Sequence, residues 1–254
     1  MTLRSAPRKQ QLLSSLGSAL LLCCAAVAQD VVITTDNQQR QVKVVGVSPS
    51  GTSLEFLVGA GKLGLPLASV REVRMAPPPE FNAAIQAYQA RDYAKALVQA
   101  KAVVDRFRGM PAPWAQQATA MIGELYIAMD DLPKAEAAYA AFQKAYPAGG
   151  SVQSEIGLAR LAVAKKDLAT AKTKLGPVID AALKEANPGG PNGLAYSQAF
   201  VVSGELKQAE GDFSGALEDY LRTVTLYFHD RASASLAQQR ADALRKAHPE
   251  IAVP

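Results

Sequence analysis

The sequence predicts a mainly α-helical chain with a small all-β module in front of the helices. Between residues 31 and 75, apolar and polar side chains alternate in short β-branched runs, the period of a half-buried strand. The proline run 77–79 marks a boundary, and an Ala-rich sequence with helix-spaced apolar positions follows it. The predicted division is therefore a targeting segment at residues 1–28, the β module at 29–76 and the helical domain at 77–254.

Residues 1–28 have the three parts of a secretory signal peptide: a positive front, an uncharged segment rich in Leu and Ala, and a small-residue site. The positive charges come from Arg4, Arg8 and Lys9. We expect cleavage after Ala28 and export to a periplasm or cell envelope. An uncleaved anchor is the alternative, because residues 11–28 form a stretch of 18, near the lower limit for spanning a bilayer.

The charge balance disfavours a nucleic-acid partner. The formal charge is +4, from 27 Lys and Arg against 23 Asp and Glu. The basic front of the targeting segment supplies most of this excess, so the rest of the chain is nearly neutral and offers no field for a phosphate backbone. Both cysteines, Cys23 and Cys24, also lie in that segment, so the remainder has no disulfide and no Cys metal site.

Four or five short strands are expected between residues 31 and 75. Leu54, Phe56 and Val58 alternate with more polar neighbours, and residues 31–35 and 42–47 are β-branched runs. So few strands bury little surface unless they curl into a small barrel or dock on a neighbour. Their order, and the ending at 65–75, resemble five-stranded barrels of the Sm-like type.

The helical part repeats a hairpin pattern that is clearest in residues 121–147. Small residues at Gly123 and Ala135 allow two helices to approach, and Pro147 ends the second helix. Aromatic side chains at Tyr126, Tyr139 and Phe142 fill the space between hairpins. Three further units place an alanine where this one has Ala135, namely Ala96, Ala171 and Ala216. A last amphipathic helix at 231–247 fits a cap.

This pattern resembles the tetratricopeptide repeat (TPR), and the chain as a whole resembles TPR proteins of the bacterial cell envelope. The usual period is about 34 residues, whereas the alanines here are 39, 36 and 45 apart, which indicates longer links. The resemblance implies a TPR-like α-solenoid of helical hairpins, with a concave face built from the first helix of each pair.

Carried onto this chain, the resemblance also implies a set of groove residues. The positions after each first small residue are Tyr88, Gln89, Glu124, Ile127, Arg160, Glu205 and Gln208. Gln117, Gln153 and Gln198 share one equivalent position further upstream. Such a lining offers polar groups to an extended peptide. The alternative is that these side chains simply form solvated helix faces.

No pattern in the sequence predicts catalysis, a cofactor or a metal site. The two histidines, His229 and His248, are expected to be exposed near helix ends. Asp130-Asp131 resembles a carboxylate pair, but it falls in a hairpin turn, where we expect it to cap the helix that begins near Leu132.

These observations favour an exported, non-catalytic scaffold or adaptor that binds a protein or extended peptide. We expect peripheral or no membrane association after signal cleavage, and the sequence fixes no oligomeric state. The alternative is a glycan- or peptidoglycan-associated module that acts through the β strands. Sugar faces usually need exposed aromatic rings, and Phe56 is the one aromatic residue between 31 and 75.

Overall fold

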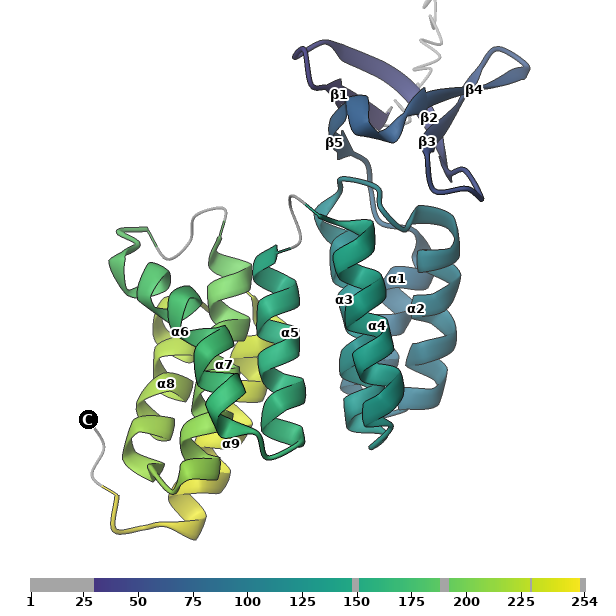
Figure 1. The fold of residues 1–254 in the computed structure, drawn as a ribbon. Helices are drawn as coiled ribbons and strands as arrows, with labels where there is room; N and C mark the ends of the chain where they lie inside the picture. Colours follow the sequence, from purple (N-terminus) through teal and green to yellow (C-terminus); the bar gives the residue numbers. More distant parts are fainter. Residues whose placement is uncertain (1–29, 148–150, 188–191, 229, 252–254) are drawn as a thin grey trace, which may run out of the picture.

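The computed structural model describes residues 30–147, 151–187, 192–228 and 230–251. Within these ranges the chain is mainly helical, with a small antiparallel sheet at the N-terminal end (Figure 1). This confirms the coarse fold class, a helical chain preceded by a β module. None of the helices in the described ranges is long and apolar enough to cross a bilayer. The expected signal peptide and His229 lie outside the described residues.

Five strands form one sheet in the order β4-β3-β2-β1-β5, and every neighbouring pair is antiparallel. The bounds are β1 Asp30–Thr34, β2 Gln39–Val47, β3 Ser53–Val58, β4 Gly61–Pro66 and β5 Val70–Arg74. Leu54 and Phe56 are buried, as the alternation predicts, whereas Val58 at the end of β3 is exposed.

Nine helices follow in the described part of the chain. Their bounds are α1 Pro79–Gln89, α2 Tyr93–Phe107, α3 Pro113–Ala128, α4 Leu132–Ala145, α5 Ser151–Ala164, α6 Leu168–Lys184, α7 Gly193–Glu210, α8 Phe213–Leu226 and α9 Arg231–Ala247. Consecutive helices pack as hairpins, and α1, α3, α5, α7 and α9 also pack on one another in that order. The odd-numbered helices therefore form an inner layer. The last helix, α9, occupies the predicted range.

The sheet does not close into a barrel; of the two arrangements expected from the sequence, curling or docking on a neighbour, the structure shows docking. Strands β4 and β5 are its two edges and do not pair within residues 30–74. The sheet docks on the helices, and its Val32 and Leu54 share one hydrophobic core with Phe107 and Trp114. Docking buries the apolar face that closure would otherwise have to bury.

Three close contacts hold the sheet on the helices. The Val73 backbone N–H donates to the Pro111 carbonyl at 2.9 Å, and the Trp114 indole N–H donates to the Met75 carbonyl at 3.2 Å. A Cβ atom at Gly46 would lie 2.7 Å from the carbonyl oxygen of Arg106 near the end of α2. Only glycine permits β2 to approach α2 this closely.

The four hairpins α1–α2, α3–α4, α5–α6 and α7–α8 have the same kind of turn. An aspartate at each turn accepts a hydrogen bond from the backbone N–H three residues on and so caps the second helix; these residues are Asp92, Asp131, Asp167 and Asp212. The residue before each aspartate has a positive φ, at Arg91, Asp130, Lys166 and Gly211. Asp131 thus caps α4, as expected, and Asp130 is the left-handed residue of that turn.

Small residues lie wherever two helices come closest. The predicted alanines Ala96, Ala135, Ala171 and Ala216 are all fully buried. The ring of Tyr139 on α4 packs between Gly123 of α3 and Gly157 of α5, and a Cβ atom on Gly123 would lie 2.5 Å from it. Tyr139 therefore packs α3, α4 and α5 against one another. This contact lies at the junction between α1–α4 and α5–α9, the two groups of helices in Figure 1.

Replacing Ala135 by Leu tests the packing of this junction. Ala135 shares its core with Tyr139 and Leu161, so the larger side chain should lower the free energy of unfolding by about 1–3 kcal/mol through overpacking. Thermal unfolding measures the effect. Ala137→Leu, at an exposed position of the same helix, is the matched control, and equal melting temperatures for the two variants would contradict the packing described.

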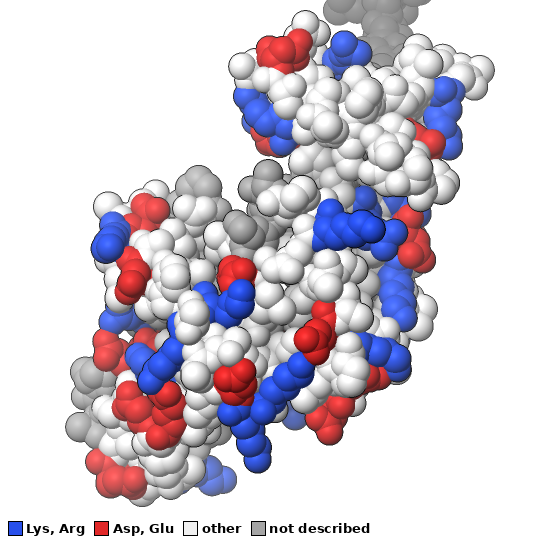
Figure 2. All heavy atoms as spheres, viewed as in Figure 1, with Lys and Arg blue, Asp and Glu red and all other residues white. Residues whose placement is uncertain are grey.

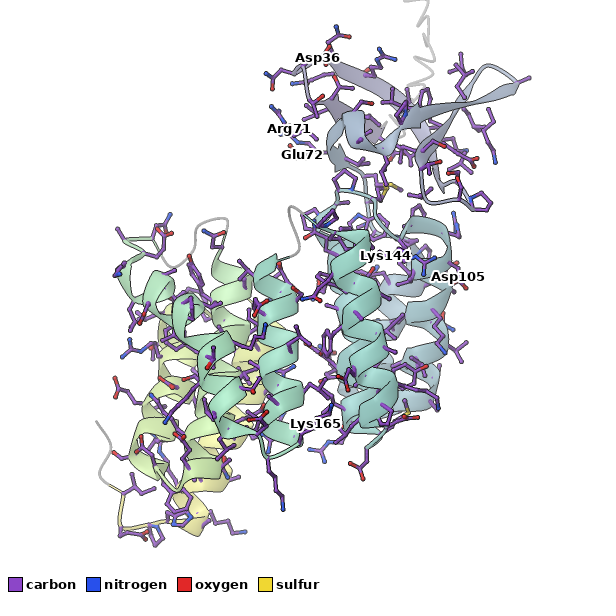
Figure 3. All side chains as sticks on the ribbon, viewed as in Figure 1. Asp36, Arg71, Glu72, Asp105, Lys144 and Lys165 are labelled. Carbon is purple, nitrogen blue, oxygen red and sulfur yellow. The ribbon has the colours of Figure 1, made fainter. Side chains whose placement is uncertain are left out.

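Replacing Asp92 by Ala tests the repeated turn. The Lys95 N–H that donates to Asp92 at 3.1 Å loses its partner, so we expect a loss of about 0.5–2 kcal/mol in urea unfolding. Asp105 lies exposed on α2 (Figure 3), and Asp105→Ala should change stability by less than about 0.5 kcal/mol. Equal losses in the free energy of unfolding for Asp92→Ala and Asp105→Ala would contradict a stabilising cap at Asp92.

Candidate functional site

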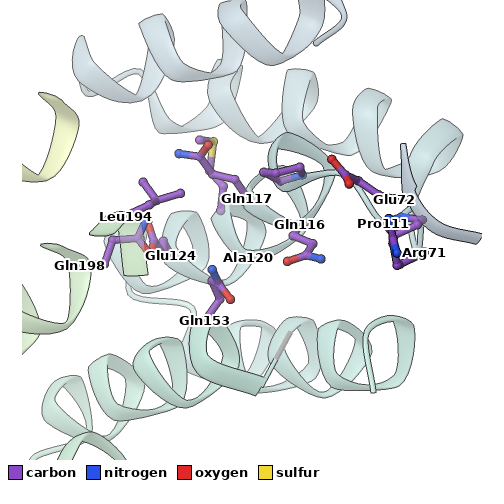
Figure 4. A pocket seen from close by; sticks show the side chains of 12 residues that line it. Arg71, Glu72, Pro111, Gln116, Gln117, Ala120, Glu124, Gln153, Leu194 and Gln198 are labelled. Atoms are coloured by element: carbon purple, nitrogen blue, oxygen red, sulfur yellow. The ribbon is translucent and has the colours of Figure 1, made fainter. Parts of the chain in front are cut away.

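A cavity of about 350 Å³ lies where the inner helices meet the β module. Its lining comes from β5, from the link before α3 and from α3, α5 and α7. In Figure 4, Arg71, Glu72 and Pro111 stand at one end, and Leu194, Gln198 and Glu124 at the other. The cavity is therefore elongated and crosses three helices of the inner layer.

Four glutamine side chains line this cavity. Gln116 and Gln117 lie in the first turns of α3, Gln153 in the first turn of α5 and Gln198 early in α7. Because the odd-numbered helices run in the same direction, their N-terminal ends meet at one side of the inner layer. Within the described residues, none of these carboxamides has a hydrogen bond to another protein group. Each keeps a donor and an acceptor for a ligand.

The charged groups at the β-module end of the cavity have their own partners. Arg71 donates a hydrogen bond to the Asn37 side chain, and Glu72 forms an ion pair with Arg74 at 2.7 Å. The Arg74 guanidinium lowers the pKa of the Glu72 carboxyl. Figure 3 places Arg71 and Glu72 side by side on the module. This end of the cavity is polar but close to neutral.

Beneath the cavity, an ion-pair ladder crosses the inner helices. Arg160 Nη1 of α5 lies 2.9 Å from Glu124 Oε1 of α3, and Arg160 Nε lies 3.6 Å from Glu205 Oε2 of α7. Glu205 Oε1 is in turn 3.6 Å from Arg240 Nη2 of α9. The side chains of Arg160, Glu205 and Glu124 are only 14%, 17% and 21% exposed. The ladder therefore joins four helices; its three members on α3, α5 and α7 are largely desolvated, whereas Arg240 on α9 is 49% exposed.

Burial is the largest influence on the pKa of Glu124, a carboxyl of this ladder. It raises the pKa of Glu124, although the charge of Arg160 acts in the opposite direction. Burial, and secondly the negative charge of Glu124, raise the pKa of Tyr88 on α1 to about 12. The Tyr88 hydroxyl is therefore protonated at neutral pH.

The structure brings only some of the predicted groove residues together. Gln117, Glu124, Gln153 and Gln198 line the cavity. Arg160 and Glu205 do not line it; Arg160 forms ion pairs with both Glu124 and Glu205.

The other four predicted positions lie away from the cavity. Tyr88 packs against Tyr93 with ring centroids 5.9 Å apart, and Ile127 packs in the core around Tyr139. Gln208 accepts a hydrogen bond from the Tyr220 hydroxyl at 3.1 Å. Gln89 is exposed at the end of α1. None of these four belongs to the lining.

Sequence reasoning missed the contribution of Arg71, Glu72 and the proline link before α3. These residues reach the cavity because the sheet docks on α1–α3, and no local pattern signals that docking. Gln116 also lines the cavity, and its position directly before the predicted Gln117 could have suggested it.

Acidic and basic side chains are interspersed over the face in Figure 2. In the described ranges, no three His, Cys, Asp or Glu side chains are grouped so that they could hold a metal ion. His248 stacks on Phe213, with ring centroids 3.7 Å apart, and its Nδ1 lies 3.1 Å from Glu250.

Comparison of the chain with models of protein families, with curated proteins and with solved structures gave no match.

Replacing Arg160 by Met tests the ladder. The change leaves the carboxyls of Glu124 and Glu205 mostly buried with no shared cation, so we expect a destabilisation of about 3–5 kcal/mol at neutral pH. Lys165→Met is the matched control. Lys165 at the end of α5 (Figure 3) pairs with Glu136 at 2.6 Å, but both side chains are well exposed, so its loss should cost less than about 1 kcal/mol.

The cost of Arg160→Met should also depend on pH. A carboxyl whose pKa is raised in the folded state favours folding when protonated, and its penalty grows as pH rises above the ordinary value of 4.5. Urea unfolding should therefore show a smaller cost as the pH is lowered from neutral toward that value. A cost independent of pH, or equal to that of Lys165→Met, would contradict a buried ladder.

Proposed function

We propose that this protein is a non-catalytic adaptor that binds an extended peptide segment of a partner protein in the inner-layer cavity. One observation carries the proposal: four carboxamides that have no protein partner among the described residues line a single elongated cavity, and they come from three different helices. A carboxamide donates and accepts at once, as a peptide group does. A row of them matches the repeating backbone of an extended chain better than it matches a compact ligand.

The size and walls of the cavity support the same proposal. Its volume of about 350 Å³ falls within the usual range of small ligand sites. Besides the glutamines, the lining includes the apolar residues Pro111, Pro113, Met121 and Leu194. These apolar surfaces suit the side chains of a short peptide stretch.

We further propose a TPR-like solenoid as the architecture of the helical domain. The inner layer of odd-numbered helices, the four identical turns and the four buried alanines support this assignment. In such an arrangement the inner layer carries the binding surface and the β module covers one end of the stack. The five strands are placed where they can do so, because their core is continuous with that of α1–α3.

We also propose a cellular location, which features of the sequence support. The basic front, apolar segment and small-residue site of residues 1–28 favour export and a role in the cell envelope. The cysteine-free remainder of the chain suits an oxidising compartment.

The glycan-binding alternative has less support. Sugar rings usually stack on exposed aromatic faces, and Phe56, the one aromatic residue of the β module, is only 6% exposed. The cavity lining contains no aromatic side chain either. Backbone recognition by carboxamides is therefore the better supported reading.

The proposal is tested with a random library of short displayed peptides selected on the protein expressed from its full-length sequence. Peptides that bind are then titrated against the triple variant Gln117→Ala, Gln153→Ala and Gln198→Ala. Each lost pair of hydrogen bonds contributes about 1 kcal/mol, so we expect the affinity to fall by about a hundredfold or more in isothermal titration calorimetry.

A second triple variant controls for the loss of glutamine itself. Gln86, Gln99 and Gln143 lie on α1, α2 and α4 and do not line the cavity, so their replacement by Ala should leave peptide affinity unchanged. Equal affinity for both triple variants would exclude the cavity as the peptide site. Failure of the library to yield any specific peptide would reject the proposed function.

A further inference from the structure

The charges around the cavity indicate which kind of peptide it binds, and this inference rests on the proposed function. We propose that the bound peptide carries one Lys or Arg side chain, and that its cationic head group binds Glu124 at the inner end of the cavity. The argument depends on how the structure distributes charge around that carboxylate.

Among the described residues, the two carboxylates of the ladder, Glu124 and Glu205, share their cations unequally. Glu124 and Glu205 share Arg160, and Glu205 also faces Arg240. The carboxylate of Asp230, just before α9, also raises the pKa of Glu124, after burial and Glu205. Its Oδ2 atom is buried and has no hydrogen-bond partner. Glu205 thus has two guanidinium groups within 3.6 Å, whereas Glu124 has only Arg160, which it shares with Glu205, so the deficit of positive charge lies at Glu124.

The geometry of Arg160 leaves this deficit at the cavity. Arg160 contacts Glu124 Oε1 at 2.9 Å, but its Nε is 3.6 Å from Glu205, is buried and has no hydrogen-bond partner. The Arg160 guanidinium is therefore shared by two carboxylates and satisfies neither of them fully. Of those two, Glu124 is the one that lines the cavity, so it is the carboxylate that a bound ligand can reach.

No other cation of the lining compensates for Glu124. Arg71 is the one basic residue among the lining residues, and it stands at the opposite end of the cavity in Figure 4. It is also engaged by Asn37. Because Glu124 is mostly buried, a ligand cation there is less screened than it would be at the surface.

The walls near Glu124 suit a long basic side chain. Leu194 and Met121 line the same region and are apolar. Lys and Arg side chains place their methylene stems along apolar surface while the charged head binds a polar group beyond it. A cationic peptide residue would thus place its stem against Leu194 and Met121 and its head against Glu124.

The probes for the test are mixtures of short peptides with acetylated and amidated ends, random flanks and one fixed central residue. The central residue is Lys, Arg or norleucine, the last being an uncharged analogue of Lys. Retention on the immobilised full-chain protein is read by mass spectrometry. We expect the Lys and Arg mixtures to be retained about tenfold more strongly than the norleucine mixture, since a charge-assisted hydrogen bond is stronger than a neutral contact.

Two variants locate the effect. Glu124→Gln keeps the shape of the side chain, and we expect it to reduce retention of the Lys and Arg mixtures to the norleucine level. Glu155→Gln is the matched control, because Glu155 lies on α5, pairs with Lys174 at 3.0 Å and does not line the cavity. It should preserve the full preference.

Equal retention of the Lys and norleucine mixtures by the unmodified protein would overturn the inference, and this comparison needs no variant to fold. A preference that survives Glu124→Gln in a folded variant would overturn it as well. If the mixtures bind equally but the cavity glutamines are needed, the proposed function stands without this inference. If no mixture binds, the proposed function fails first.

Discussion

The placement of Tyr139 between two glycines is the contact on which the inner layer depends. Its ring fills the space that side chains at Gly123 of α3 and Gly157 of α5 would occupy, and it is fully buried with its hydroxyl unpaired. Glu124 directly follows the first of these glycines, and Arg160 lies one turn after the second. The close approach of α3 and α5 is what brings these two side chains within 2.9 Å, and it sets the distance across which the cavity glutamines face each other.

The ladder beneath the cavity contributes more to geometry than to stability. Buried ion pairs gain little over apolar packing, because both charges lose their hydration, but breaking one leaves an uncompensated charge. The pairing of Glu124, Arg160, Glu205 and Arg240 therefore penalises any sliding of α3, α5, α7 and α9 past one another. In our proposal the same groups give the cavity its electrostatic character, so the shape and the charge of the site have one source.

The local features of the fold were predictable from the sequence, and the long-range ones were not. The turn aspartates and the buried alanines repeat in phase, because each hairpin solves the same packing problem with neighbours in the sequence. The choice between closure and docking of the sheet could not be predicted, because it depends on contacts between Val32 or Leu54 and residues about fifty or more positions away. The repeat pattern predicted that glutamines occupy equivalent helix positions. That they line one cavity with Arg71 and Glu72 depends on the docking of the sheet.

The central claim is that the cavity glutamines bind a peptide backbone, and their side-chain amide signals report this most directly. We would record proton–nitrogen correlation spectra of the labelled protein, assign the carboxamide signals by single substitutions, and add a selected peptide. The account predicts shifts for Gln116, Gln117, Gln153 and Gln198, which line the cavity, with Gln86, Gln99 and Gln143 unchanged. Shifts confined to glutamines outside the cavity, with the four lining signals unmoved at saturation, would contradict it.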